Sequence, residues 1–430
     1  MNRHSSVAVT VCLLVTIVAC NPGGGESGFR PMEPGKVLFW DRQTTETADL
    51  LRKMIDEFNT GREGPAVEAQ YAGDYSDIFR KVRASIQARA VPDMAVAYQS
   101  MTSEYVRAGA CLPLDPFMAD PAAGLSSEEL GDFFPVVLET NRLPQFGGKM
   151  YSFPFCKSVL MMYFNKRVLA EAGIQQAPAT WDEFLEQCRQ IKAKTGKSAY
   201  AVSVDASTID GMVYSRGGDV IDGNTTLFDS PPAMDVFRLL ETLAKEELAY
   251  QIPPGSADDK VAFSQDRVAF VFRSSSHRTN MTLLMEGNLD RWGIARLPQA
   301  DPAKPTTVLY GPNICIFDTT PEQSRVAWDF VRFFTSRENT VRWALATGYV
   351  PIRKSAADHP EMKKFWDAWE YNRTAFDCLP FARSEPTCAG WQEVRGLIED
   401  AETAVLSQLR SADEAARELK KAADAVLAAG

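Results

Sequence analysis

The stretch Gly147–Ile174, GGKMYSFPFCKSVLMMYFNKRVLAEAGI, decides the fold of this chain. A Gly-Gly turn opens it, residues 150–156 alternate as in a strand, and the apolar run 159–164 extends that strand. A helix is predicted next, because Asn165 fits an N-cap position and Gly173 fits the position just past a helix end. A run this apolar indicates a strand buried on both faces of a sheet.

Two polar residues, Lys157 and Ser158, interrupt this apolar stretch. Buried polar groups need hydrogen-bond partners, so both side chains have to meet one in the folded protein. One interpretation is a core strand that contains a turn. The other is a segment that crosses between two lobes and presents Ser158 to a ligand in the cleft.

The N-terminus has the pattern of a lipoprotein signal, predicted over residues 1–19. Arg3 supplies a basic start, residues 7–19 are apolar but too few to span a bilayer, and the run ends at Ala19-Cys20. An ordinary signal peptide with a chance cysteine is the alternative. We expect Cys20 to carry the lipid, residues 20–35 to form a flexible tether, and the folded body to work outside the cytoplasm, in the periplasm or at the cell surface.

The composition predicts a soluble body hung from that anchor. The 430 residues are 45% hydrophobic and 24% charged, enough for two or three domains with a large core. A formal net charge of -10 disfavours nucleic acid as a partner, because phosphate backbones require basic surfaces. Past the signal, no second apolar stretch is long enough to span a membrane. Cys378 and Cys388 form a disulfide in one interpretation and stay free thiols in the other.

Strands alternate with helices from residue 36 onward. The segments 37–40, 66–71 and 93–98 are predicted strands, and amphipathic helical patterns separate them. This order predicts a parallel sheet covered on both faces, with ligands bound at the loops beyond the carboxyl ends of the strands. Those loops contain Trp40, Tyr75 and Gln99.

Short motifs along the rest of the chain resemble those of one family. They are GKMYSFPF, DRVAFVF, WGIARLP, AWDFVRFFTS and GYVPIR, in this order. Together with the lipoprotein signal, they resemble the carbohydrate-type extracellular solute-binding proteins of ABC importers, family 1. The resemblance implies an α/β fold of the type II periplasmic-binding-protein class, a clamshell of two lobes that closes over a solute and then docks on a membrane permease.

The same resemblance implies a division of the chain. Lobe 1 is expected to comprise residues 36–150 plus 308–348, and lobe 2 residues 151–307 plus 349–430. The chain is expected to cross between the lobes near Tyr151, Val308 and Tyr349. We expect a monomer that performs no chemistry on its solute and needs no cofactor or metal.

The chain looks most similar to the glycerol-3-phosphate-binding subgroup. Carried over residue by residue, that likeness implies a cleft lined by Tyr75, Gln99, Ser158, Ser275, Gly311, Tyr349 and Arg395. Gln99 departs from the pattern, because the subgroup has an acid there. The subgroup's tryptophan pair is also missing at Val204 and Ser207, which puts stacking on a glycerol-sized ligand in doubt.

Two further expectations come from the residues themselves. The Arg395 guanidinium is a planar fork that fits a phosphate or carboxylate, unless it is a solvated residue on a helix whose core face holds Leu397, Ala401, Val405 and Leu409. Aromatic side chains suit the C-H faces of sugars, although each of them could equally be core packing. The candidates are Trp40, Tyr75, Tyr214, Tyr349 and Trp391.

Two other classes of function are alternatives to solute binding. Only His277 and His359 remain in the mature chain, and Ser274 near His277 lacks an orienting third group for nucleophilic catalysis. A glycoside hydrolase built on two carboxylates stays open on sequence grounds. A sensory or adhesion lipoprotein of the same fold, working without a transporter, is the second alternative.

Overall fold

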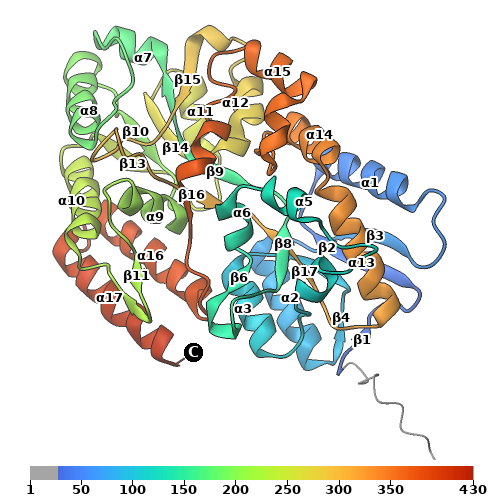
Figure 1. Cartoon of the computed structure of the whole chain (residues 1–430). Coiled ribbons are helices and arrows are strands. Elements are labelled where there is room, and N and C mark those ends of the chain that lie inside the picture. Colours follow the sequence, from blue (N-terminus) through green and yellow to red (C-terminus); the bar gives the residue numbers. More distant parts are fainter. Residues whose placement is uncertain (1–27, 430) are drawn as a thin grey trace, which may run out of the picture.

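The computed structural model describes residues 28–429. They form two α/β lobes, each built around its own sheet (Figure 1). Within this range no helix is long and apolar enough to cross a membrane. The predicted signal and Cys20 lie outside the described residues.

Lobe 1 is built on a five-stranded sheet in the order β3-β2-β5-β17-β8. Strands β2 and β3 are parallel, β5 runs parallel to β2, and β17 runs antiparallel to both β5 and β8. The strands are β2 (Lys36–Asp41), β3 (Ala66–Tyr71), β5 (Met94–Ala97), β8 (Ser152–Pro154) and β17 (Asn313–Ile316). The main helices packed around them are α1 (Thr45–Asn59), α2 (Tyr75–Gln87), α3 (Gln99–Arg107), α13 (Pro321–Phe334) and α14 (Arg337–Thr347).

Lobe 2 is built on a seven-stranded sheet in the order β13-β10-β14-β9-β16-β18, with β15 also paired to β9. Its strands are β9 (Ser158–Asn165), β10 (Tyr200–Val202), β13 (Ala249–Gln251), β14 (Phe270–Ser274), β15 (Trp292–Ala295), β16 (Thr307–Tyr310) and β18 (Ala382–Ser384). Its helices include α7 (Lys166–Glu171), α8 (Trp181–Thr195), α9 (Ala206–Tyr214), α10 (Pro231–Lys245), α11 (Asp258–Ser264), α12 (Arg278–Leu284), α16 (Trp391–Leu406) and α17 (Ala412–Ala429).

The stretch that decides the fold crosses from one sheet to the other. The predicted continuous strand is interrupted, because β8 belongs to the lobe 1 sheet and β9 to the lobe 2 sheet. All eight residues of β9 are buried, as its apolar run predicted, since it pairs with β14, β15 and β16. Of the two interpretations of Lys157 and Ser158, the crossing between two lobes is therefore the correct one.

The chain passes between the sheets at two further places. Residues 311–312 join β16 to β17, and a long segment after α14 leads back to β18. The first two changes of sheet come slightly later in the chain than the crossings expected near Tyr151 and Val308. The α/β architecture with two lobes is confirmed.

One detail of the expected packing is wrong, and the structure distinguishes the two interpretations of one cysteine pair. Helix α16 ends at Leu406, so Leu409 lies beyond it and is 70% exposed instead of facing the core. Cys378 and Cys388 are free thiols, because the Cys378 thiol donates to the Thr374 carbonyl oxygen at 3.2 Å, whereas Cys388 packs against the lobe 2 core.

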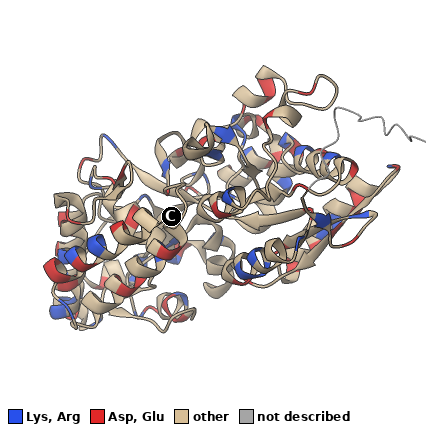
Figure 2. Cartoon of the chain, turned by 90° about the horizontal axis from the view of Figure 1, so that it is seen from below, with Lys and Arg blue, Asp and Glu red and all other residues tan. Residues whose placement is uncertain are grey.

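The outer helices carry both signs of charge. Figure 2 shows Lys and Arg interspersed with Asp and Glu along the helices on this side of the molecule. Such a mixed surface is typical of a solvated exterior and unlike the basic stripe that nucleic acid requires.

Candidate ligand-binding site

Loops at the carboxyl ends of strands from both sheets meet between the lobes. From lobe 1 come Arg42 after β2, Tyr75 after β3 and Tyr98 after β5. From lobe 2 come Asp205 after β10 and the turn 275–277 after β14. Strand ends of an α/β sheet are where ligands bind, so this junction is the candidate site. We call it the interlobe cluster; it comprises Arg42, Tyr75, Tyr98, Asp205, His277, Tyr310, Tyr349, Glu385 and Arg395.

An aromatic wall forms the lobe 1 side of the interlobe cluster. The ring centroids of Tyr75 and Tyr98 are 4.7 Å apart, and the Arg42 guanidinium carbon lies 4.6 Å from the Tyr75 centroid. Tyr349 interacts with the Tyr75 hydroxyl, and burial raises the pKa of both phenols. Both hydroxyls are therefore protonated at neutral pH and can donate and accept hydrogen bonds.

Arg395 lies at the centre of a buried ion-pair network on the lobe 2 side. Its Nη1 donates to a carboxylate oxygen of Glu385 and, at 3.0 Å, to the Ser207 hydroxyl. Its Nη2 donates to Oδ1 of Asp205 at 3.2 Å. The guanidinium carbon lies 5.5 Å from the Tyr98 ring centroid. Although burial acts to lower the pKa of Arg395, the two carboxylates raise it above the ordinary value.

A further buried carboxyl, that of Asp210, lies beside this network. Asp210 on α9 is fully buried, and neither of its oxygens accepts a hydrogen bond from a donor among the described residues. Burial, followed by the charge of neighbouring Glu385, raises the pKa of Asp210 well above its usual range. This shift favours the neutral form of Asp210, since two adjacent buried carboxylates cannot both stay ionised.

Asp205 is the carboxylate of the network that reaches solvent. Its side chain is 34% exposed, whereas that of Glu385 is 2% exposed. One of its oxygens accepts from Arg395, and the other accepts from the Thr208 hydroxyl at 3.3 Å. A partly solvated carboxylate beside tyrosine rings can accept further hydrogen bonds from a ligand's hydroxyl groups.

Hydroxyl groups and a neutral imidazole extend the lobe 2 side. The Ser274 and Ser276 hydroxyls are 2.7 Å apart, and the Ser275 hydroxyl accepts from the Val159 amide at 3.3 Å. Burial, followed by the charge of Lys260, lowers the pKa of His277 to about 3. His277 is therefore neutral at physiological pH, able to donate from one ring nitrogen and accept at the other.

The remaining predicted site residues lie at the lobe junction or in the core. The Ser158 hydroxyl donates to the Tyr310 carbonyl oxygen at 3.5 Å, and the Gly311 carbonyl oxygen accepts from Lys157 at 2.9 Å. Gln99 donates across the lobes to the Glu385 carbonyl oxygen at 3.2 Å. The Trp40 indole donates to the Gln70 side chain at 3.0 Å within the lobe 1 sheet.

The sequence profile of the bacterial extracellular solute-binding proteins matches residues 53–372. The chain belongs to this family. Among its relatives is the sn-glycerol-3-phosphate-binding periplasmic protein UgpB of Escherichia coli K12, 22% identical over 347 residues that span 77% of each protein. The predicted family is thereby confirmed.

Solved structures of solute-binding proteins share the fold of this chain. UgpB of Mycobacterium tuberculosis, solved with glycerophosphocholine, is 21% identical with a TM-score of 0.79, covering 92% of this chain and 99% of that protein. The cyclic α-maltosyl-1,6-maltose binding protein of Arthrobacter globiformis is 20% identical with a TM-score of 0.78, covering 93% and 100% respectively. At this identity the comparison establishes the clamshell fold.

The structure of this solute-binding protein gathers some of the predicted residues and separates others. Tyr75, Tyr349 and Arg395 belong to the interlobe cluster, and Gln99 adjoins it. Ser158, Ser275 and Gly311 make contacts where the chain crosses between the lobes. Of the other candidate aromatics, Tyr214 and Trp391 are packed in the lobe 2 core, 2% and 1% exposed.

Sequence reasoning missed several members of the solute-binding protein's site. Arg42 lies two residues past the predicted strand 37–40, and Asp205 lies three residues past strand β10, so the strand-end rule could have found both. Glu385 and Asp210 carried no such signal, because they reach the site through the loop before α16 and through the buried face of α9. Within residues 28–429 no group of three or more His, Cys, Asp or Glu side chains could hold a metal ion.

Proposed function

We propose that this protein is the solute-binding subunit of an ABC importer, anchored by lipid at Cys20, and that it captures a neutral polyhydroxylated solute of the carbohydrate type. Closure of the two lobes would hold the solute at the interlobe cluster, and a membrane permease would receive it. The division of the chain into two lobes that close on each other and a monomeric state belong to the same proposal.

The internal neutralisation of Arg395 carries the choice of a neutral solute. A buried arginine anchors an anionic ligand when its charge is unpaired, but here Glu385 and Asp205 pair with it, and these two residues and Ser207 take three of its five N-H donors. A phosphate placed there would have to displace a carboxylate and would face the negative charge of Asp205. A hydroxyl group can donate to Asp205 without either cost.

The other groups of the interlobe cluster support the same class of solute. Tyrosine rings offer apolar faces to the C-H groups of a sugar, and their protonated hydroxyls offer polar tips. Neutral His277 and the hydroxyls of Ser274 and Ser276 both donate and accept, which matches the hydroxyls of a polyol. The three related proteins named above bind glycerol-3-phosphate, glycerophosphocholine or a cyclic maltose-derived sugar, so both classes belong in the test.

A titration of the soluble body with matched ligands tests this function. The calorimetric panel contains maltose, larger neutral oligosaccharides and monosaccharides, and we expect at least one of these sugars to bind. Glycerol-3-phosphate and glycerophosphocholine should bind at least about tenfold more weakly than that sugar. Asp205→Asn should lower the affinity for the sugar by about tenfold, since a charged hydrogen-bond acceptor is lost. Asp222→Asn, an exposed acid elsewhere on lobe 2, is the control.

Tighter binding of the phosphates than of the sugars would overturn the proposal of a neutral solute, and Arg42 would then be the anchor to examine. Importer function itself is tested by a knockout strain that loses uptake of the bound solute. Normal uptake with loss of a solute-dependent response would favour the sensory alternative.

A further inference from the structure

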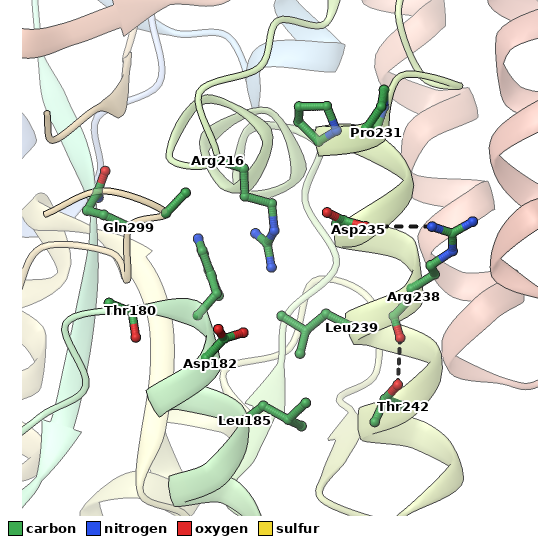
Figure 3. Close-up of a pocket in the computed structure, with 13 residues that line it drawn as sticks. Thr180, Asp182, Leu185, Arg216, Pro231, Asp235, Arg238, Leu239, Thr242 and Gln299 are labelled. Carbon is green, nitrogen blue, oxygen red and sulfur yellow. Dashed lines mark hydrogen bonds and ion pairs between the residues drawn. The ribbon is translucent and has the colours of Figure 1, made fainter.

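A pocket on the outer side of lobe 2 is separate from the interlobe cluster. It has a volume of about 550 Å³ and lies between the start of α8 and the first turns of α10 (Figure 3). This volume is within the range of small-molecule sites. The pocket shares no residue with the interlobe cluster; it is lined by Thr180, Trp181, Asp182, Leu185, Arg216, Pro231, Pro232, Asp235, Arg238, Leu239, Thr242, Gln299 and Ala300.

Arg216 points into this pocket from the turn after α9 (Figure 3). Its guanidinium carbon lies 4.0 Å from the Trp181 ring centroid, and its Nη1 donates to the Met212 carbonyl oxygen at 3.0 Å. Among the described residues no carboxylate lies within 4.0 Å of it. A guanidinium has five N-H donors, so most of this fork remains available to a ligand.

The platform under Arg216 is rigid. The Trp181 indole donates to the Ser215 hydroxyl at 3.1 Å, and Phe184 and Phe272 pack edge-on against the indole. Trp181 is 7% exposed. These contacts fix the position of the ring, and stacking together with the bond to Met212 orients the guanidinium, which reduces the entropy lost on binding.

The rest of the wall is apolar with an acidic rim. Leu185 and Leu239 face each other across the pocket in Figure 3, and the two prolines that begin α10 border it. Asp235 is paired with Arg238 at 3.7 Å, and Arg238 points away from the pocket (Figure 3). Asp182 is exposed at the start of α8.

We propose that this pocket is a second ligand site, which takes a small organic monoanion with a planar carboxylate and a flat apolar body. The carboxylate would accept two hydrogen bonds from Arg216, and the apolar body would lie between Leu185 and Leu239. Asp182 and Asp235 add negative charge near the guanidinium, so a dianion such as a phosphate monoester is disfavoured.

Three probes of similar shape test this site by calorimetry: 3-phenylpropionate, its neutral analogue 3-phenylpropionamide, and dianionic phenyl phosphate. We expect 3-phenylpropionate to bind at least about tenfold more tightly than the other two, because only it matches both the fork and the single charge. Arg216→Gln should lose about tenfold in affinity for 3-phenylpropionate. Arg189→Gln, which removes an exposed arginine of α8 that pairs with Glu246 and does not line the pocket, should stay within about twofold.

A second variant keeps the proposal testable even if Arg216→Gln does not fold. Asp182→Asn changes an exposed side chain and should improve phenyl phosphate binding more than 3-phenylpropionate binding, since rim repulsion acts more strongly on the dianion. Equal binding of the amide and the carboxylate, or an unchanged ratio of the two anions in Asp182→Asn, would overturn the site.

The second site stands independently of the proposed sugar capture. A saturating cleft solute should leave the affinity for 3-phenylpropionate unchanged, and Asp205→Asn should not affect it. Displacement of 3-phenylpropionate by that solute would assign the binding to the interlobe cluster and reject the second site.

Discussion

The side-chain nitrogen of Lys157 donates a hydrogen bond to the carbonyl oxygen of Gly311 at 2.9 Å, which joins two of the chain's crossings between the lobes. The carbonyl oxygen of Lys157 also accepts from the Val350 amide at 2.8 Å, at the start of the third crossing. One residue thus contacts all three connections. The lobes are joined where a fully buried lysine has no carboxylate within ion-pair distance among the described residues.

Gly311 is a position where a side chain cannot be added. Its φ is +111°, and an added Cβ would lie 2.1 Å from the Cys156 carbonyl oxygen. We expect Gly311→Ala to lower the free energy of unfolding by about 3 kcal/mol or more, because backbone strain and a clash add. Gly147→Ala, with φ +74° and open space around it, is the matched control and should cost about 1 kcal/mol. Chemical denaturation of both variants measures the difference, and equal losses would contradict the clash.

Lys157 should make stability depend on pH. Burial lowers its pKa to about 7 from the ordinary 10.5, partly offset by the charges of Cys156 and Glu385. Between these pH values the unfolded chain binds a proton that the folded protein does not, so the free energy of unfolding rises with pH across this window. Below pH 7 Lys157 is protonated in both the folded and the unfolded protein, and its buried charge lowers the free energy of unfolding.

Substitution isolates this contribution from other titrating groups. We compare the free energies of unfolding of wild type and Lys157→Met at each pH. The wild-type value minus the variant value should increase by on the order of a few kcal/mol from pH 7 to pH 10. Lys53→Met, an exposed lysine on α1, should show a flat difference. Urea unfolding at several pH values supplies the data, and a flat difference for Lys157→Met would show that its charge is not suppressed in the folded protein.

The buried pair of Arg395 and Glu385 predicts a characteristic double-mutant cycle. Arg395→Met leaves Glu385 buried without its counter-charge and should lower the free energy of unfolding by about 3 to 5 kcal/mol. Adding Glu385→Gln should recover part of that loss, because the orphaned charge is removed. If Arg395→Met kept its stability and lost only ligand affinity, the arginine would be a ligand anchor and the network account would be wrong.

Arg42 should affect binding without affecting folding. Its side chain is exposed and lies over the Tyr75 ring. The Tyr75 hydroxyl raises the pKa of Arg42, and this effect outweighs the lowering caused by partial desolvation. We expect Arg42→Gln to change the free energy of unfolding by less than about 0.5 kcal/mol and to lower the affinity for the solute by about fivefold or more. Arg52→Gln, an exposed arginine paired with Asp49 on α1, is the control for affinity. Unchanged affinity in Arg42→Gln would remove this residue from the site.

Local pattern was enough to predict much of the architecture. The alternation of strands and helices from residue 36 predicted a covered parallel sheet, although strand β17 of that sheet is antiparallel to its neighbours. The apolar run 159–164 predicted a strand buried on both faces, because periodicity reports which faces meet the core. The motifs predicted the family. The strand-end rule located Tyr75 and Gln99 at the lobe junction, since all parallel strands end at the same edge of their sheet.

Only the tertiary structure decided how the charged groups are used. Sequence left Arg395 open as a ligand anchor or a solvated residue. The fold buries it in an ion-pair network that the sequence did not indicate, because its partners Asp205 and Glu385 lie on other elements. The same holds for Lys157, which the sequence marked as an interruption and the fold turned into the junction of three crossings. Local pattern depends on neighbours in the chain, whereas the charge state of a buried group depends on neighbours in space.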